Sequence, residues 1–258
     1  MSTIIYPAPI FGPVTSRRLG RSLGVNLLPA DGKVCSFDCV YCECGLNVER
    51  RPREDMPTRP RIASALRERL LCMKTAGEQL DAITFSGNGE PTSHPDFEGI
   101  VDDVIALRGE FFPAAKVCLL TNSTHLGKDS VFRAVQKIDK ACLKLDTVNP
   151  DYIRLVDRPQ TRYDLAKLIE RMKQLSGRCV IQTMFMKGTV DGVSVDNTGD
   201  EYVLPWLETV REIAPSAVDI YTISRETPLK TLQKASTEEL DRIVQLVRAA
   251  GIDAHAFG

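Results

Sequence analysis

The sequence predicts an α/β fold in which parallel strands alternate with helices. Short apolar runs typical of buried strands recur along the chain, and between them apolar residues repeat at the i, i+3, i+4 and i+7 spacing of a helix. Such alternation indicates parallel strands joined by right-handed helical crossovers. The sheet is either an open, doubly wound one or part of a (β/α) barrel.

The elements follow in order after an arm or hairpin rich in Pro and Gly at residues 1–21. We expect strands over 23–28, 82–85, 116–120, 140–145, 179–186 and 217–223, and a short one near 252–257. Helical patterns cover 62–70, 95–109, 165–172 and 236–251. The second opens on Pro95, a residue suited to the first helical position, and the last opens on a Ser236-x-x-Glu239 capping box.

One domain is expected over residues 1–258, comprising the arm (1–21), a core (22–225) and a C-terminal helix with a short strand (226–258). A chain of 258 residues is long enough for one full core. The formal net charge of −1 argues against a dedicated nucleic-acid binder. No apolar run approaches the ~18–20 residues of a membrane span. The N-terminus lacks the pattern of a signal peptide, so we expect a cytoplasmic protein.

Eight cysteines in 258 residues are too few for a disulfide scaffold. Three of them, Cys35, Cys39 and Cys42, form a C-x3-C-x2-C group. A structural zinc site needs four ligands, usually as two separated pairs, and Cys42-x-Cys44 is too tight to complete one. An iron–sulfur cluster held by three thiolates leaves one iron open to a ligand. We therefore favour a cluster over zinc, without Cys44 as a ligand, and expect no auxiliary cluster because no further C-x2-C pair follows.

Polar stretches follow several of the expected strands. In either architecture, ligands bind beyond the carboxyl ends of the strands. We expect one site to collect Cys35–Cys42, Ser86–Pro91, Thr121–Ser123, Asp146 and Lys187–Gly188.

The cysteine spacing, with Tyr41 before the third cysteine, resembles the radical S-adenosylmethionine (radical SAM) superfamily, over roughly residues 30–225. Ser86–Pro91 looks like the family's G-G-E-P turn, with Asn88, which tolerates positive φ, in place of one glycine. Leu119–Ser123 resembles the T-N motif that ends the third strand, and Leu143–Asp146 the fourth-strand segment. Gly12–Gly20 is most similar to small Fe–S oxidoreductases grouped loosely with wyosine-type radical SAM enzymes.

The resemblance implies a partial (β/α)6 TIM-like barrel that carries a [4Fe–4S] cluster on Cys35, Cys39 and Cys42. S-adenosylmethionine would bind the open iron. The implied cofactor contacts are Tyr41 at the adenine; the turn Gly87, Asn88, Gly89, Glu90 and Pro91 at the methionyl ammonium; Asn122, Ser123 and Asp146 at the ribose; Lys144 at the carboxylate; Gln182 and Thr183 as further polar contacts; and Tyr221 and Ile223 at the adenine through their backbone.

The implied activity is reductive cleavage of S-adenosylmethionine to a 5′-deoxyadenosyl radical, which abstracts hydrogen from a small molecule or nucleoside. Such an oxidoreductase or lyase needs a reductant such as flavodoxin or ferredoxin; tRNA is a conceivable partner that the net charge does not support. One alternative is an activase acting on a glycine of a partner protein. Another is a non-catalytic iron–sulfur or zinc protein.

Two further features concern the substrate. Arg17, Arg18, Arg21 and Arg225 are candidates for binding an anionic group, with ordinary ion pairing as the alternative. The Gly/Asp-rich stretch 187–198 follows a strand at the same end of the sheet. Long loops in compact domains often act as lids, so we weigh a substrate-covering role against a plain surface loop.

Overall fold

The computed structural model describes residues 4–258, which separate into two compact units. The β1–β4 unit contains Ile5–Cys35 and Arg50–Ala141, and the β6–β11 unit contains Ile4, Ser36–Glu49 and Cys142–Gly258. The first three residues of the predicted arm lie outside the described part. The expectation of one domain over residues 1–258 stays a prediction.

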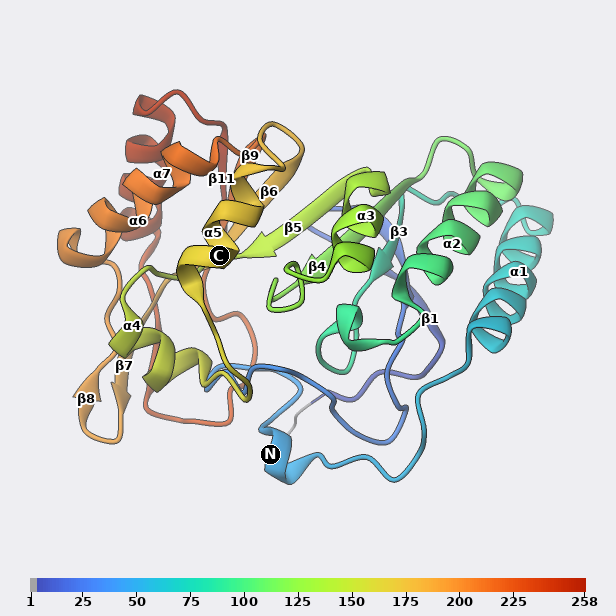
Figure 1. The fold of residues 1–258 in the computed structure, drawn as a ribbon, viewed down its shortest axis with the longest axis horizontal. Coiled ribbons are helices and arrows are strands. Elements are labelled where there is room, and N and C mark those ends of the chain that lie inside the picture. Colours follow the sequence, from blue (N-terminus) through green and yellow to red (C-terminus); the bar gives the residue numbers. More distant parts are fainter. Residues whose placement is uncertain (1–3) are drawn as a thin grey trace. The chain divides into compact units, whose positions relative to one another are not determined.

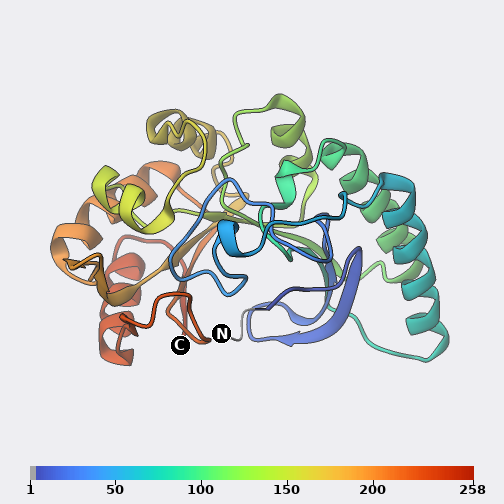
Figure 2. The same cartoon turned by 90° about the horizontal axis from the view of Figure 1, so that it is seen from below.

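In the β1–β4 unit, the arm forms an antiparallel hairpin of β1 (Ile10–Ser16) and β2 (Gly20–Val25), drawn in dark blue in Figure 2. Parallel pairing then joins β2 to β3 (Ala82–Phe85) and β3 to β4 (Lys116–Thr121). Helices α1 (Arg59–Thr75), α2 (Phe97–Phe111) and α3 (Asp129–Lys137) pack side by side (Figure 1). All four β3 side chains are buried, as expected for a parallel strand covered on both faces.

In the β6–β11 unit, β6 (Cys179–Met184), β9 (Ala217–Tyr221) and β11 (Ala254–Phe257) pair in parallel. The helices are α5 (Leu165–Lys173), α6 (Asp200–Ile213) and α7 (Thr237–Ala249). The predicted capping box is present, because Ser236 and Glu239 each accept a hydrogen bond from the other's backbone N–H. The chain passes from one unit to the other within β5 (Lys140–Lys144). The predicted alternation of strands and helices is confirmed.

The stretch 187–198 is partly a β-hairpin. β7 (Met186–Val190) pairs with β8 (Val193–Ser194), and β10 (Leu232–Lys234) completes a small separate sheet. The strand predicted over 179–186 therefore breaks after Met184. Asn197 lies at this break: its side chain accepts from Met186 N (2.9 Å) and donates to Met184 O (2.8 Å).

Two local features escaped sequence analysis. The helix expected from Pro95 begins at Phe97, with Asp96 as N-cap. After β5, a short α4 (Pro150–Tyr152) continues into a π-helical turn, η3 (Ile153–Asp157), which is too short to show a periodic pattern. Two 3₁₀ turns, η1 (Asn47–Glu49) and η2 (Pro91–Ser93), complete the elements. Within residues 4–258, no helix combines the length and apolarity that crossing a bilayer requires.

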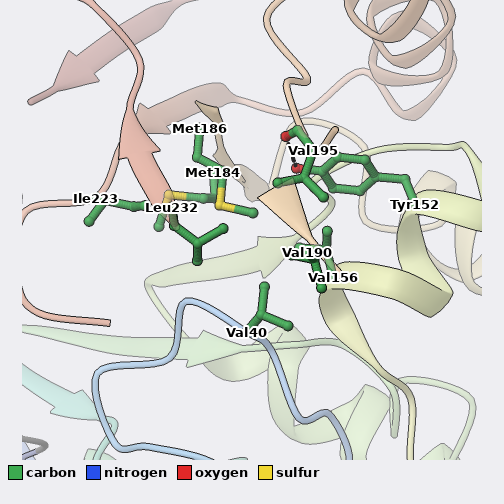
Figure 3. Close-up of a cluster of buried hydrophobic side chains, with 9 residues drawn as sticks. All are labelled: Val40, Tyr152, Val156, Met184, Met186, Val190, Val195, Ile223 and Leu232. Atoms are coloured by element: carbon green, nitrogen blue, oxygen red, sulfur yellow. Dashed lines mark hydrogen bonds between the residues drawn. The ribbon is translucent and has the colours of Figure 1, made fainter. Parts of the chain in front are cut away.

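An apolar cluster in the β6–β11 unit anchors the cysteine loop (Figure 3). Val40, between Cys39 and Tyr41, has no exposed surface in this cluster. Tyr152 donates its hydroxyl to Val195 O (3.2 Å), so even the polar atom of that side chain is satisfied. Burying a valine side chain stabilises by ~1.5–3 kcal/mol. The cluster contains Val40, Tyr152, Val156, Met184, Met186, Val190, Val195, Ile223 and Leu232.

Candidate functional site

The cysteine loop of the β6–β11 unit is tied to the π-helical turn on both sides of Cys39. Asp38 N donates to Asp157 O (3.0 Å), and Val40 N donates to Val156 O (3.0 Å). Cys39 and Cys42 are half-buried, and Cys39 Sγ lies 3.8 Å from Asp157 Oδ1. Backbone hydrogen bonds and the buried Val40 together hold Cys39 in one place.

A buried charged group lies beside this loop. The Lys144 ammonium pairs with Asp146 and with Asp157 Oδ1 (2.9 Å), and the exposed fractions of the three side chains are 11%, 1% and 4%. Tyr41 donates its hydroxyl to Asp146 and accepts from Lys144, whose Nζ also lies 4.9 Å from the Tyr41 ring centroid. Met184 N donates to Asp146 Oδ1 (3.0 Å), which attaches the group to β6. The predicted residues Tyr41, Lys144 and Asp146 are thus in direct contact.

Burial and mutual attraction together determine the ionisation of the side chains around Lys144. Burial raises the pKa of Asp157 to about 6, although Lys144 opposes the rise. Burial lowers the pKa of Lys144, but Asp146 and Asp157 together raise it well above its ordinary value. Burial, followed by Asp146, raises the pKa of Tyr41. The raised pKa values keep the proton on Lys144, between the two acidic side chains, and keep the Tyr41 hydroxyl neutral.

In the β1–β4 unit, the turn Ser86–Pro91 pairs directly with the residue before Cys35. Val34 N donates to Asn88 O (3.0 Å), Glu90 N donates to Val34 O (3.0 Å), and a parallel bridge joins Val34 to Gly89. Gly89 has φ +126°, and a Cβ added there would lie 2.0 Å from Val34 O. Only glycine fits such a position. The first cysteine and the turn therefore form one structural element.

Asn88 occupies the position where the family's turn has glycine, and its side chain explains the difference. Gly87 and Gly89 have positive φ, whereas Asn88 does not. The fully buried amide instead accepts from Tyr6 N (2.7 Å) and donates to Tyr6 O and Pro29 O (both 2.8 Å). Asn88 thus ties the N-terminal arm to the turn, and tolerance of positive φ is the wrong explanation for it.

Glu90 links the ends of β3 and β4. Its carboxylate, in a residue 1% exposed, accepts from Thr92 N (3.1 Å), Thr92 Oγ1 (2.6 Å), Thr121 Oγ1 (2.6 Å) and Asn122 N (2.6 Å). Burial raises its pKa, and hydrogen bonds from Thr121, Thr92 and Asn122 lower it in part. Because its carboxylate accepts four hydrogen bonds, the Glu90 side chain orients Thr92, Thr121 and Asn122.

Asn122 and Ser123 follow β4 and lie next to Cys35. Asn122 Nδ2 donates to Cys35 Sγ (3.6 Å). Ser123 has φ +68°, is 1% exposed, and donates its backbone N–H to Thr121 Oγ1 (3.0 Å). Its buried Oγ has no hydrogen-bond partner within residues 4–258. A buried polar group left unpaired is destabilising by ~1–3 kcal/mol, so this hydroxyl is suited to a ligand.

The remaining predicted cofactor contacts lie on β6, at the end of β9 and just after β9. Gln182 and Thr183 are buried. Thr183 donates its hydroxyl to Leu145 O (2.9 Å), which occupies that hydrogen, and Gln182 O accepts from Leu145 N (3.0 Å). Tyr221 ends β9, half-buried, and packs with Ile223 at the apolar cluster.

The four candidate arginines do not gather in one unit. Arg17 and Arg18 lie in the β1–β2 turn and Arg21 on β2, where it pairs with Glu78. Arg225, in the other unit, pairs with Glu43 Oε2 (2.6 Å). Both ion pairs are exposed.

The structure adds residues that the sequence did not single out. Asp157 and Thr92 belong to no periodic pattern or motif, and only their long-range contacts reveal them. Within the described residues, no three His, Cys, Asp or Glu side chains converge closely enough to hold one metal ion. A cubane cluster, in which each thiolate binds a different iron, does not require that convergence. In the β1–β4 unit, half-buried Cys35 with its Asn122 Nδ2–H donor and the orphaned Ser123 hydroxyl are groups of the kind that an iron–sulfur cluster and an adenosyl group need. The β6–β11 unit contains half-buried Cys39 and Cys42.

Comparison with known proteins decides the family. The Radical SAM superfamily model matches residues 31–194, well over half of the chain. The chain belongs to the Radical SAM superfamily. Radical SAM enzymes use a [4Fe–4S] cluster and S-adenosylmethionine and require a reductant and a substrate, so this chain is an enzyme with those two cofactors.

Curated relatives differ in how much of their length the chain spans. A UPF0026 protein of Synechocystis sp. is 31% identical over 229 residues, covering 87% of this chain and 78% of that protein. GTPase Obg of Brachyspira hyodysenteriae is 28% identical over 238 residues, but the chain spans only 32% of it. GTP 3′,8-cyclase of Streptomyces coelicolor is 24% identical over 163 residues, covering 63% of this chain and 45% of that protein.

Solved structures share the fold. A radical SAM methyltransferase from Sphaerobacter thermophilus has a TM-score of 0.67 at 19% identity, covering 92% of this chain and 65% of that chain. TYW1 with a lysine–pyruvate adduct has a TM-score of 0.60 at 13% identity, covering 89% and 73%. Streptococcus suis SuiB bound to S-adenosylmethionine has a TM-score of 0.61 at 19% identity, covering 90% of this chain and 50% of that chain. The predicted fold class, a partial (β/α) barrel of the radical SAM type, is confirmed.

Proposed function

We propose that the chain binds its [4Fe–4S] cluster through Cys35, Cys39 and Cys42 and cleaves S-adenosylmethionine to abstract hydrogen from a small molecule or nucleoside. Together the cofactors supply one-electron cleavage of a C–S bond and a carbon radical. The likeness to GTP 3′,8-cyclase, whose name states a nucleotide substrate, favours a nucleoside. Flavodoxin or ferredoxin would supply the electron.

One observation carries this proposal. The turn that resembles the family's G-G-E-P motif is hydrogen-bonded through Asn88 O and Glu90 N to Val34, the residue before the first cysteine. Two motifs that are far apart in sequence, and that the family uses for cluster and cofactor, are therefore one element of this structure. Neither a zinc site nor a plain electron carrier needs this turn.

The chain's own residues have distinct tasks in this proposal. The backbone of Gly87–Glu90 accepts hydrogen bonds from the methionyl ammonium, because glycines permit close approach there. The Ser123 hydroxyl bonds to a ribose hydroxyl, which satisfies its orphaned oxygen. Lys144 binds the methionyl carboxylate, and Asp146 orients Lys144 and Tyr41.

Water exclusion is the task of the apolar cluster. A reactive carbon radical must meet one C–H bond of the substrate and no solvent. Three side chains of the cluster, each at most 9% exposed, come from different segments: Val40 from the cysteine loop, Met184 from the end of β6 and Ile223 from just after β9. We assign them the apolar wall of the reaction site.

Anaerobic reconstitution tests the proposal. Dithionite-reduced wild-type protein should release 5′-deoxyadenosine from S-adenosylmethionine, as measured by liquid chromatography. Cys35→Ala, Cys39→Ala and Cys42→Ala should each lose most of the cluster iron and sulfide. Cys44→Ala is the matched control, a buried cysteine of the same loop, and should keep both cluster and activity.

Two outcomes would contradict the proposal. Wild-type protein with a full cluster that forms no 5′-deoxyadenosine would exclude the radical chemistry. A full cluster in Cys39→Ala would exclude the ligand assignment. Adding candidate nucleosides and measuring deuterium transfer from labelled substrate into 5′-deoxyadenosine then identifies the substrate class.

A further inference from the structure

The side-chain amide of Asn122 lies beside the first cysteine of the motif. Asn122 and Cys35 are 87 residues apart in sequence, yet Nδ2 lies 3.6 Å from Sγ. That distance suits an N–H···S hydrogen bond, because sulfur is larger than oxygen. Asn122 is 9% exposed, so water competes little for its N–H.

The orientation of the amide is determined by Thr124. Asn122 Oδ1 accepts from Thr124 N (3.0 Å) and from Thr124 Oγ1 (2.8 Å). A flipped amide would place its NH₂ group against the backbone N–H of Thr124, donor against donor. The nitrogen therefore faces Cys35, and the oxygen does not.

The backbone of Asn122 is held by Glu90. Asn122 N donates to Glu90 Oε2 (2.6 Å), while Glu90 Oε1 accepts from Thr121 Oγ1 (2.6 Å). Three constraints thus act on one residue: its N–H, its side-chain oxygen and the residue before it. Such double-sided fixing of a donor is typical of groups that tune a metal site.

We infer that Asn122 donates a hydrogen bond to the cluster sulfur of Cys35 and thereby raises the reduction potential of the [4Fe–4S] cluster. This inference rests on the proposed role of Cys35 as a ligand. Reduction adds one electron from the external reductant to the cluster, and no bond to protein forms or breaks. The added negative charge spreads onto the thiolates, so an N–H donor stabilises the reduced state more than the oxidised state. Glu90 is a positioning residue that acts through Asn122.

Redox titration of the reconstituted enzyme without S-adenosylmethionine tests this role. The cluster is titrated with dithionite in the presence of mediators and followed by EPR. Asn122→Ala should have a more negative midpoint potential than wild type. Asn122→Asp should be more negative still, because it turns a carboxylate oxygen towards the sulfur. We expect a change of roughly tenfold in the one-electron equilibrium constant for Asn122→Ala, which is about 59 mV.

Ser123→Ala is the matched control. It is the next residue, is also buried, and its Oγ makes no hydrogen bond to a described residue. Without S-adenosylmethionine, the cluster of this variant should therefore have the wild-type potential. Glu90→Gln should shift the potential in the same direction as Asn122→Ala but by less. Its NH₂ group would face the hydrogen-bond donors that the Glu90 carboxylate accepts from, including Asn122 N, and would loosen Asn122 without removing it. Wild-type potentials in both Asn122 variants, with full clusters, would overturn the inference.

A second measurement detects the Asn122 nitrogen itself near the cluster. With nitrogen-15 in the asparagine side-chain amides, pulsed EPR of the reduced cluster should detect a coupled nitrogen that is absent in Asn122→Asp. No such coupling in wild type would also overturn the inference. Failure of the proposed ligand assignment appears differently, as an intact cluster in Cys35→Ala.

Discussion

Replacing Lys144 by Met removes the ammonium that lies between two buried carboxylates. Asp146 and Asp157 are only 1% and 4% exposed, so water cannot replace Lys144. At the 2.9 Å separation of Lys144 and Asp157, Coulomb attraction at an effective dielectric constant of ~20 is about 6 kcal/mol before desolvation is subtracted. Breaking a buried pair from one side typically destabilises by ~3–5 kcal/mol. We expect Lys144→Met to lower the free energy of unfolding at pH 7 by about that amount.

The loss should shrink as the pH falls. Burial raises the pKa of Asp157 to about 6 in the folded protein, above its unfolded value of ~3.9. A carboxyl with a raised folded pKa binds more protons in the folded than in the unfolded state, so its contribution to stability increases as pH falls through that window. Without Lys144 the rise in pKa is larger. The difference in free energy of unfolding between wild type and Lys144→Met should therefore be smaller at pH 5 than at pH 7.

Urea unfolding of the apoprotein, followed by tryptophan fluorescence, measures this difference. The chain has one tryptophan, and Trp206 donates Nε1–H to Leu145 O (2.9 Å), between Lys144 and Asp146. Lys187→Met is the control, because Lys187 pairs with Glu239 in the same unit but is partly exposed, and such pairs contribute ~0–1 kcal/mol. A loss below ~1 kcal/mol for Lys144→Met, or a loss equal at pH 5 and pH 7, would refute the reasoning.

Three further changes test the β1–β4 unit. Asn88→Gly makes the turn more like the family's but removes the hydrogen bonds to Tyr6 and Pro29. Unfolding followed by circular dichroism should show a free energy of unfolding about 2–3 kcal/mol lower. Unchanged stability would mean that the arm does not depend on this amide. Gly89→Ala places a Cβ 2.0 Å from Val34 O and should weaken S-adenosylmethionine binding by calorimetry at least ~tenfold, whereas wild-type affinity would exclude the tight turn. Ser123→Ala should weaken the same binding by about tenfold, the loss of one hydrogen bond of ~1.4 kcal/mol. The apoprotein should be no less stable, because the change removes an unpaired buried hydroxyl; equal affinity would leave Ser123 without a role at the ribose.

The superfamily of this chain could be predicted from the sequence because its signals are local. Cys35, Cys39 and Cys42 are separated by a few residues, so their spacing is visible without any tertiary information. The strand and helix alternation and the capping box at Ser236 are likewise short-range patterns, set by side-chain periodicity and backbone hydrogen bonding. Together these features were enough for the fold class and for the superfamily.

Only the tertiary structure decided what surrounds the motifs. Asp157 meets Cys39 across 118 residues, and Asn122 meets Cys35 across 87; no periodicity or spacing connects positions so far apart. The role of Asn88 is likewise visible only in the tertiary structure, because its buried amide bonds to the backbone of Tyr6 and its own φ is not positive. A local pattern determines which chemistry the chain carries, whereas the packing of distant segments determines which side chains orient and tune it.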